Sequence, residues 1–519
     1  MRSVRYILSI TFLIFTLAWS LMHVFAGYGN PQDPCFWLYK YETLTGGWMP
    51  VGTLLTGGLI VRLFGAHLLP LRIAGWLCTV AAIALPYCAL QDREGRRNNL
   101  HWLAIAFGLM GYGAFQEFSP GTLSVLLLSA LWVTSISSSP IILRLSPIIL
   151  GLAIAVRFPN ILALLVLIPL WKKKSLWNIP IAAVVAGLIY LLGACFLTPA
   201  PVDPTMGSHG MGEMITKLWE NGGKVVGYVL MWLGVIAISN FKFQISNIKY
   251  QILLGIAVGA ALCYYVTFVP PVHQWYNFDL TYLISVGCLT LAVMTKRREL
   301  LFGAAICVVA SLGTDTAWLK LFPVSLCLLP VAAVAYESKV RAYLFPALIG
   351  LMVAAMMRFR INSIGDFDLN YANTPSAVAP YDGIRIREVD ERQLRQYIAD
   401  YDSLKTDSTT ILALGRDHHR MRAVTGCQAA MYNEFWSNIF DSIYTDKYRA
   451  IIRAERPIVF CSFTPGFKTK PAYKDTQSAM ENMLREEGYR EINRKKYKYM
   501  IYIPTSNDQR LTTDESEVQ

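Results

Sequence analysis

The sequence predicts a polytopic α-helical membrane protein with an α/β domain at its C-terminal end. Hydrophobic residues make up 54% of the 519-residue chain and charged residues only 16%, with a mean hydropathy of +0.39. A soluble protein of this size would carry roughly a quarter charged residues. Apolar stretches fill residues 1–357, which predicts a membrane domain, whereas residues 358–505 have the composition of a soluble domain.

Lysine and arginine cluster between the apolar stretches, and every cluster can be placed on one side of a membrane. The clusters are Arg93/Arg96/Arg97, Lys172/Lys173/Lys174, Lys242/Lys249, Lys296/Arg297/Arg298 and Lys339/Arg341. Because positive charge marks the cytoplasmic face, the opposite loops should face away from the cytosol. Topology also accounts for much of the net charge of +12, so we expect no nucleic acid among the partners.

A span needs about 20 apolar residues, and fewer when the segment is buried among others. On this criterion we predict about thirteen spans, at residues 6–26, 70–90, 100–116, 119–136, 141–156, 160–171, 179–198, 224–239, 251–269, 278–294, 300–313, 317–336 and 342–357. The first is expected to be a retained span rather than a cleaved signal peptide, because it is followed by a poor cleavage site.

Residues 50–66 decide the parity of the crossings. They are apolar enough to cross the membrane. A crossing there would, however, place the first basic cluster outside, and the later clusters would no longer fit a single cytoplasmic side. We therefore predict that they lie in the outer interface as an amphipathic helix. The thirteen remaining crossings then give an integral, multi-pass plasma (inner) membrane protein whose C-terminal domain is extracytoplasmic.

The C-terminal part alternates between strand and helix patterns. Strands are predicted at 384–387, 409–415, 457–462 and 498–503, and helices at 390–398, 444–453 and 476–487. This alternation predicts a two-layer or three-layer α/β domain, and the polar residues 506–519 predict a disordered tail. Cys427 and Cys461 should both face the oxidising side, where either a disulfide or two thiols would fit, because geometry decides between them.

Two acids in outer loops are candidates for catalysis. Asp33 follows the first span directly and could serve as a general base, hold a metal ion, or only form an Asx turn before Pro34. Glu117 lies in the tight turn between the third and fourth spans, where it is either functional or an ordinary exposed loop residue.

Several further polar residues are candidates for binding substrate. Arg157, at the outer end of a short span, could bind a lipid phosphate or extend to the interface. His273 and Asp279 flank aromatic residues in one outer turn, which could hold a sugar. Asp315 and Lys320 either pair with each other or place a cation for phosphate.

One polar group stands out in the predicted soluble domain. The run Asp417-His-His-Arg420 follows a predicted strand and is its densest polar cluster. It could contact an acceptor glycan, but we interpret it as a solvated loop.

The order of residues in the first outer loop resembles a known family. Asp33 is followed by Trp37, Tyr39 and Tyr41, then by Gly46-Gly-Trp-Met-Pro50, Leu63-Phe-Gly65 and Leu71-Arg72. This order is similar to membrane glycosyltransferases of the GT-C fold, especially the protein O-mannosyltransferase and aminoarabinose-transferase branch. The resemblance covers mainly residues 28–76, with weaker similarity at Glu117, Arg157 and residues 313–316.

Two positions depart from the family pattern. Many members have an Asp-Glu pair at the position of Asp33-Pro34, and often a Lys-Pro-Pro run at that of Trp48-Met-Pro50. The branch and the substrate therefore stay open.

The resemblance implies roles for individual residues. Asp33 would be the general base, and Glu117 would help to hold the acceptor or a metal ion. Arg157 and Lys320 would bind the donor phosphate. Whether a divalent cation such as Mg²⁺ or Mn²⁺ takes part is left open, because some relatives need none; Asp33 and Glu117 would be its ligands.

Together these observations predict an inverting glycosyltransferase of the cell envelope. It would transfer a sugar from a polyprenyl-phosphate carrier in the bilayer to a glycan, lipid or protein acceptor outside the cytoplasm. The alternatives are a transporter or flippase for lipid-linked glycans and a non-catalytic envelope assembly protein. Transporters commonly have internal repeats, and we find no second half that resembles the first.

Overall fold

The computed structural model of the chain describes most of the N-terminal bundle and most of the C-terminal domain. The described residues are 2–27, 33–46, 50–94, 117–137, 139–168, 171, 176–199, 226–237, 248–268, 373–406, 410–415, 418–427, 442–462, 481–494 and 499–505, together with single helical positions at 102, 105, 106, 109, 283, 286, 287, 289–291, 293, 294, 301, 303, 305, 306, 347, 349–351, 353 and 354. The predicted domain boundary at 357/358 and the predicted tail 506–519 lie outside them.

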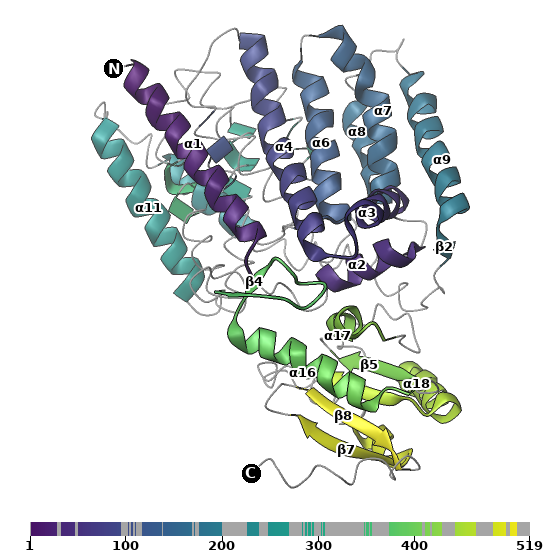
Figure 1. Cartoon of the computed structure of the whole chain (residues 1–519). Coiled ribbons are helices and arrows are strands. Elements are labelled where there is room, and N and C mark those ends of the chain that lie inside the picture. Colours follow the sequence, from purple (N-terminus) through teal and green to yellow (C-terminus); the bar gives the residue numbers. More distant parts are fainter. Residues whose placement is uncertain are drawn as a thin grey trace.

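Long helices run side by side in the N-terminal bundle (Figure 1). They are α1 (Arg2–Val24), α4 (Leu68–Glu94), α6 (Pro120–Ile136), α7 (Pro140–Val156) and α9 (Asn178–Phe196). The N-terminal part also contains α11 (Ile248–Phe268) and a helix at 226–237. Their boundaries follow the predicted spans within a few residues. Pro140 begins α7, and Ser119 caps α6 in a capping box with Thr122.

Three described helices are long and apolar enough to cross a membrane, within Ile7–Val24, Leu68–Pro86 and Asn178–Phe196. Five shorter apolar helices accompany them, at 51–64, 120–134, 140–156, 226–237 and 252–262. The predicted spans at 100–116, 278–294, 300–313, 317–336 and 342–357 lie largely outside the described residues, so the count of thirteen stays a prediction.

Small residues let the bundle helices approach closely. A Cβ atom on Gly151 of α7 would lie 2.6 Å from the carbonyl oxygen of Ala182 in α9. Close backbone approach at small residues is a common way to join helices in membranes, where the hydrophobic effect contributes little. Trp132 and Trp232 are fully buried in the large apolar cluster of the bundle.

Two short helices lie at one end of the bundle rather than within it (Figure 1). They are α2 (Asp33–Thr43) and α3 (Val51–Phe64), and β1 (Thr45–Gly46) lies between them and pairs in parallel with β2 (Thr198–Pro199). Helix α3 runs across the end of the bundle, and its outer side exposes Leu59, Leu63 and Phe64. Residues 51–64 are therefore helical, and their predicted position in the outer interface stays a prediction.

The chain has a break between the predicted spans at 141–156 and 160–171. Helix α7 ends at Val156, Arg157 has an extended backbone, and a 3-10 turn, η1 (Phe158–Leu162), leads into the short α8 (Ala163–Leu167). Proline at position 159 explains the break, because it has no N–H for the carbonyl of Ala155 and its ring would clash with that carbonyl in a continuous helix.

The C-terminal domain contains a small mixed sheet. Its elements are β3 (Thr374–Pro375), β4 (Arg385–Ile386), α16 (Glu388–Leu404), β5 (Ile411–Gly415), α17 (His418–Thr425), α18 (Ser442–Glu455), β6 (Ile458–Ser462), β7 (Tyr489–Arg494) and β8 (Tyr499–Pro504). The sheet order is β5-β6-β8-β7, with β5 and β6 parallel and the other neighbours antiparallel. Antiparallel β3 and β4 form a separate pair.

Alternating residues of the sheet belong to two different cores. Ile411 and Phe460 pack with α16 and α17, whereas Leu412, Val459 and Cys461 pack with α18 and residues 483–484. The domain is therefore a three-layer α/β domain, one of the two predicted forms.

Cys427 and Cys461 belong to different clusters and both are free thiols. The disulfide alternative was therefore wrong, because the sheet lies between the two layers. Burial raises the pKa of both thiols, which keeps them protonated.

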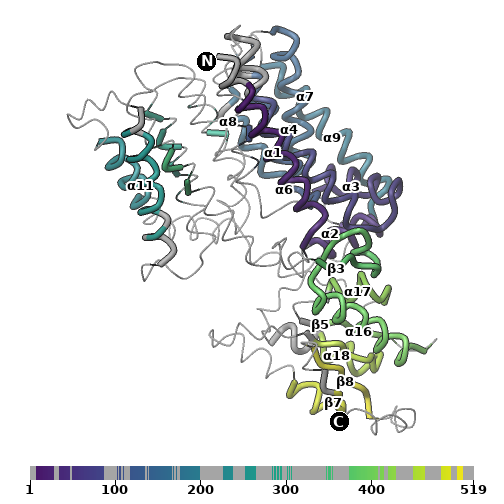
Figure 2. Tube along the Cα trace, turned by 60° about the vertical axis from the view of Figure 1, so that its left-hand side comes forward, coloured from purple at the N-terminus to yellow at the C-terminus, as the bar shows by residue number. Residues whose placement is uncertain are grey.

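The C-terminal domain lies against the end of the bundle that carries α2 and α3 (Figures 1 and 2). Figure 2 shows α17 and α16 next to α2, with the sheet beyond them, while α11 lies apart from α7 and α9. Whether this end faces away from the cytoplasm stays a prediction from the positions of the basic clusters.

Candidate active site

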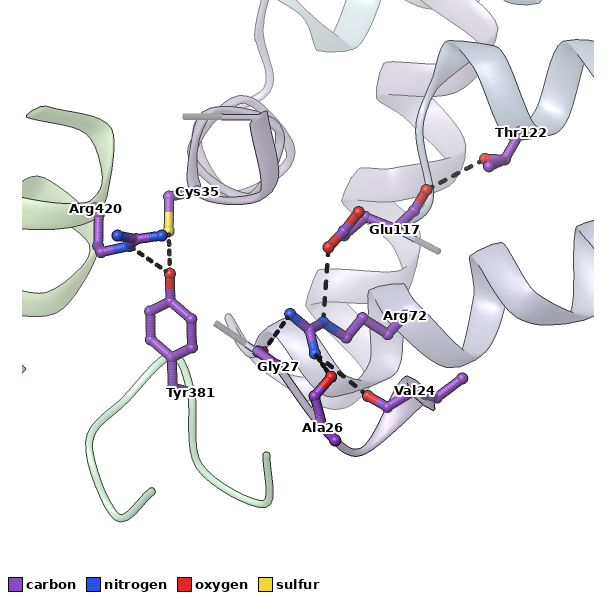
Figure 3. Close-up of polar contacts among 9 residues, drawn as sticks. All are labelled: Val24, Ala26, Gly27, Cys35, Arg72, Glu117, Thr122, Tyr381 and Arg420. Carbon is purple, nitrogen blue, oxygen red and sulfur yellow. Dashed lines mark hydrogen bonds and ion pairs between the residues drawn. The ribbon is translucent and has the colours of Figure 1, made fainter. Parts of the chain in front are cut away.

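The fully buried Arg72, near the start of α4, organises the loop that leaves α1. Its guanidinium donates hydrogen bonds to the carbonyl oxygens of Gly27 at 3.0 Å, Ala26 at 3.3 Å and Val24 at 3.5 Å (Figure 3). The last carbonyls of a helix carry partial negative charge, so a cation at the end of α1 is favourable. Arg72 thus fixes the direction in which the chain enters the first outer loop.

Glu117 lies beside the same guanidinium. Its Oε1 is 3.7 Å from Nε of Arg72, and only 13% of its side chain is exposed (Figure 3). The alternative of an exposed loop residue was therefore wrong. Oε1 is buried and accepts no hydrogen bond from the described residues. Arg72 therefore keeps the charge of this carboxylate in place.

Helix α2 is tied to the turn that carries Glu117. Tyr41 of α2 donates a hydrogen bond to the carbonyl oxygen of Phe118 at 3.0 Å, and the amide of Phe118 donates to Leu71 in α4 at 3.0 Å. Burial raises the pKa of Tyr41, so its hydroxyl stays a donor. Asp33 is the first residue of α2, although its side chain lies outside the described residues. The two predicted catalytic acids therefore belong to segments that contact each other.

Arg157 lies at the end of α7, where side chains from other elements bind the last carbonyls. Thr53 of α3 donates to the carbonyl of Val156 at 3.2 Å, and Asn160 of η1 donates to that of Ala153 at 2.8 Å. Asn160 also exchanges hydrogen bonds with Ser124 of α6. Only 7% of Arg157 is exposed, which argues against extension to the interface and supports a protein-enclosed cation.

The C-terminal domain forms the remaining wall around α2. Helix α17 includes His419 and Arg420 from the polar run predicted as a solvated loop, and both are buried. The solvated-loop interpretation was therefore wrong for these residues. Local sequence could not reveal this, because the side chains that bury α17 come from α2, almost 400 residues earlier in the chain.

Four predicted binding residues cannot be placed. His273, Asp279, Asp315 and Lys320 lie outside the described residues, and so does Asp417. Their proposed roles stay predictions. Conversely, the sequence does contain a signal that Arg72 is functional, apart from its place in the family pattern. A single arginine inside an apolar span is rare and usually faces a functional interior.

The described residues do not assemble a metal site around Glu117. In the ranges that the structure describes, no three His, Cys, Asp or Glu side chains come together. Glu117 instead faces the guanidinium of Arg72, which competes with a cation for the same carboxylate. The divalent cation stays a prediction, and no step below uses it.

No family model matches the chain, and no curated protein matches it. Solved structures do show a likeness. ArnT from Cupriavidus metallidurans in the apo state has 11% identity and a TM-score of 0.43, covering 95% of this chain and 98% of that chain. ArnT bound to undecaprenyl phosphate has 12% identity and a TM-score of 0.44, covering 96% of this chain and 97% of that one.

A third solved structure is similar to the same extent. It is the archaeal oligosaccharyltransferase AglB from Archaeoglobus fulgidus in complex with an inhibitory peptide and a dolichol-phosphate. The identity is 12% and the TM-score 0.44, covering 97% of this chain and 75% of that chain. The proposal below rests on the residues and contacts of this chain.

Proposed function

We propose that this protein is a membrane glycosyltransferase that uses a polyprenyl-phosphate-linked sugar as donor and a glycan, lipid or protein as acceptor. The observation that carries the proposal is the contact between helix α2 and the turn of Glu117 at one end of the bundle. Helix α2, which begins at Asp33, is hydrogen-bonded to the turn of Glu117, whose carboxylate is held by Arg72. An active site at the membrane surface suits a donor that stays in the bilayer.

The proposed reaction is a single inverting displacement. Asp33 removes the proton from the acceptor hydroxyl, and the oxygen attacks the anomeric carbon of the sugar. The bond between that carbon and the phosphate oxygen breaks, and the polyprenyl phosphate leaves with the electron pair. Glu117 accepts a hydrogen bond from the acceptor. Arg157 binds the phosphate, whose negative charge increases as the bond breaks.

Replacing Asp33 with Asn tests this proposal most directly. Asn has the shape of Asp but cannot accept a proton at neutral pH. Loss of a positioned base should lower the transfer rate by about a hundred- to ten-thousandfold. The measurement is transfer of a radiolabelled sugar from a polyprenyl-phosphate donor, with thermal stability of the purified protein measured in parallel.

The Asx-turn alternative for Asp33 makes the opposite prediction. Asn also forms Asx turns and tolerates the following proline, so the Asn variant would keep near-normal transfer while an Ala variant would lose stability. Substantial transfer by Asp33→Asn would exclude Asp33 as the base.

A further inference from the structure

The C-terminal domain is joined to both ends of the first outer loop by main-chain hydrogen bonds. The amide of Gly27 donates to the carbonyl of Arg385 at 2.7 Å, and the amide of Arg385 donates to the carbonyl of Phe25 at 2.7 Å. At the other end, the amide of Leu68 donates to the carbonyl of Pro380 at 3.0 Å. The β3–β4 hairpin therefore bridges the end of α1 and the start of α4.

Helix α17 of the same domain packs along α2. The ring of His419 meets the ring of Phe36 edge-on, with centroids 4.9 Å apart. The guanidinium of Arg422 lies over the ring of Tyr39, 4.0 Å from its centroid. A cation over an aromatic face contributes more when both are shielded from water, and only 8% of Arg422 is exposed.

A buried polar chain connects the domain to the first turn of α2 (Figure 3). Nε of Arg420 donates a hydrogen bond to the hydroxyl of Tyr381 at 2.9 Å, and this hydroxyl lies 3.5 Å from the sulfur of Cys35. Either the hydroxyl of Tyr381 or the thiol of Cys35 is the donor in this second contact. Arg420 is 2% exposed, and Tyr381 and Cys35 are fully buried.

Helix α2 depends on these contacts for its position. It has 11 residues, and an isolated helix shorter than about 12–15 residues is marginal in water. One apolar cluster runs from Cys35, Leu38 and Tyr41 in α2 to Tyr397 and Tyr499 in the C-terminal domain. The domain and the helix therefore share one core.

We propose that Tyr381 and Arg420 are positioning residues that hold α2, and through it Asp33, in the geometry required for transfer. This inference rests on the proposed function, in which Asp33 is the base. The C-terminal domain is then part of the catalytic unit. A reacting group displaced by about 1 Å can lose roughly a hundredfold in rate, so loss of one hydroxyl near α2 should be visible in kcat.

The test compares two variants that each remove one buried tyrosine hydroxyl. Tyr381→Phe breaks the link to α2. Tyr502→Phe makes the same chemical change on the opposite face of the sheet, in the cluster with α18. The full-length protein in detergent is assayed for kcat and for the KM of the lipid-linked donor, and hydrogen exchange is measured for residues 33–43.

For Tyr381→Phe we expect a tenfold or larger fall in kcat, a donor KM within about twofold, and faster exchange in α2. Tyr502→Phe should change none of these three quantities. Equal exchange of α2 in both variants, or faster exchange with normal kcat in Tyr381→Phe, would overturn the inference. Absence of transfer in the unsubstituted protein would instead overturn the proposed function, while the exchange data would still test the attachment of α2.

Substitutions at Cys35 separate positioning from general stability. Cys35→Ser keeps a hydrogen-bonding group beside Tyr381, whereas Cys35→Ala removes it. We expect the Ser variant to retain most of the kcat and the Ala variant to resemble Tyr381→Phe. Equal kcat values for both Cys35 variants would show that the polar chain does not position α2.

Discussion

Arg72 shows how one buried charge can define a site. The guanidinium is surrounded by the three carbonyl oxygens at the end of α1 and by the carboxylate of Glu117. Burying an arginine is costly unless its charge and its N–H groups are matched, and this arrangement matches most of them. Arg72 holds together residues 24–27 and Glu117, each of which is at least 45 residues from it in the sequence. This role explains why the buried charge is tolerated there.

Removing Arg72 should therefore damage the fold more than neutralising Glu117. Arg72→Leu leaves a buried carboxylate without its cation and three carbonyls without donors, which should cost about 3–5 kcal/mol of stability. Glu117→Gln leaves the bonds from Arg72 to the main chain in place, and should cost about 1 kcal/mol or less while lowering transfer. Thermal unfolding of the purified variants measures the difference. Equal destabilisation by the two substitutions would contradict this account.

At the scale of elements, the break after α7 gives Arg157 its place. A continuous helix through residue 160 would satisfy the carbonyl of Val156 itself, whereas here that carbonyl accepts from Thr53 of α3. The carbonyl of Ala153 accepts from Asn160 of η1 in addition to the amide of Arg157. Non-helical backbone at membrane depth is tolerated where protein buries it or where it lines a cavity. Helix α3 is thus coupled to Arg157 through Thr53.

Substitutions around this break should weaken use of the lipid donor in a graded order. Arg157→Ala loses a charge-assisted contact worth about 1.5–3 kcal/mol, so donor affinity should fall roughly ten- to a hundredfold. Asn160→Ala loses only the hydrogen bonds that hold the turn, so a smaller fall of roughly three- to tenfold is expected. Arg144→Ala, at an exposed position near the other end of α7, is the matched control. Binding of polyprenyl phosphate measures all three, and equal effects of Arg157→Ala and Arg144→Ala would remove Arg157 from the site.

Sequence patterns predicted the elements whose burial is decided locally. Apolar stretches of sufficient length predicted α6 and α7, and short continuous apolar runs predicted β5 and β6. Strand β7 was missed because Glu491 and Arg494 make it polar, and it lies at the edge of the sheet, paired only with β8. Helix α17 was missed for a related reason, since its polar side chains are buried by α2. Pairings such as Arg72 with Glu117 depend on tertiary packing, which a local pattern does not contain.

At the scale of the molecule, the C-terminal domain and the end of the bundle that carries α2 and α3 form one structure. Their shared apolar cluster and the hydrogen bonds of the β3–β4 hairpin leave α2 between them. The acceptor should therefore reach the site beside this domain. Acceptor recognition and the attachment of α2 would then depend on the same surfaces.

The orientation of the whole molecule in the membrane can be tested with two substituted cysteines. Helix α9 has 19 residues, and a rise of about 1.5 Å per residue makes it about 28 Å long, close to the thickness of the hydrocarbon core. Trp177 and Thr198 should therefore lie on opposite sides of the bilayer. Thr198 is paired with Thr45 at the end that carries the C-terminal domain. The basic cluster at 172–174 predicts that Trp177 is cytoplasmic.

The experiment labels intact cells with a membrane-impermeant maleimide. The reagent should label Glu388→Cys, whose side chain is exposed in α16. It should label Trp177→Cys no more strongly than it labels the protein without a substitution. Both should react after permeabilisation. Labelling of Trp177→Cys in intact cells would reverse the predicted orientation and place the proposed active site in the cytoplasm.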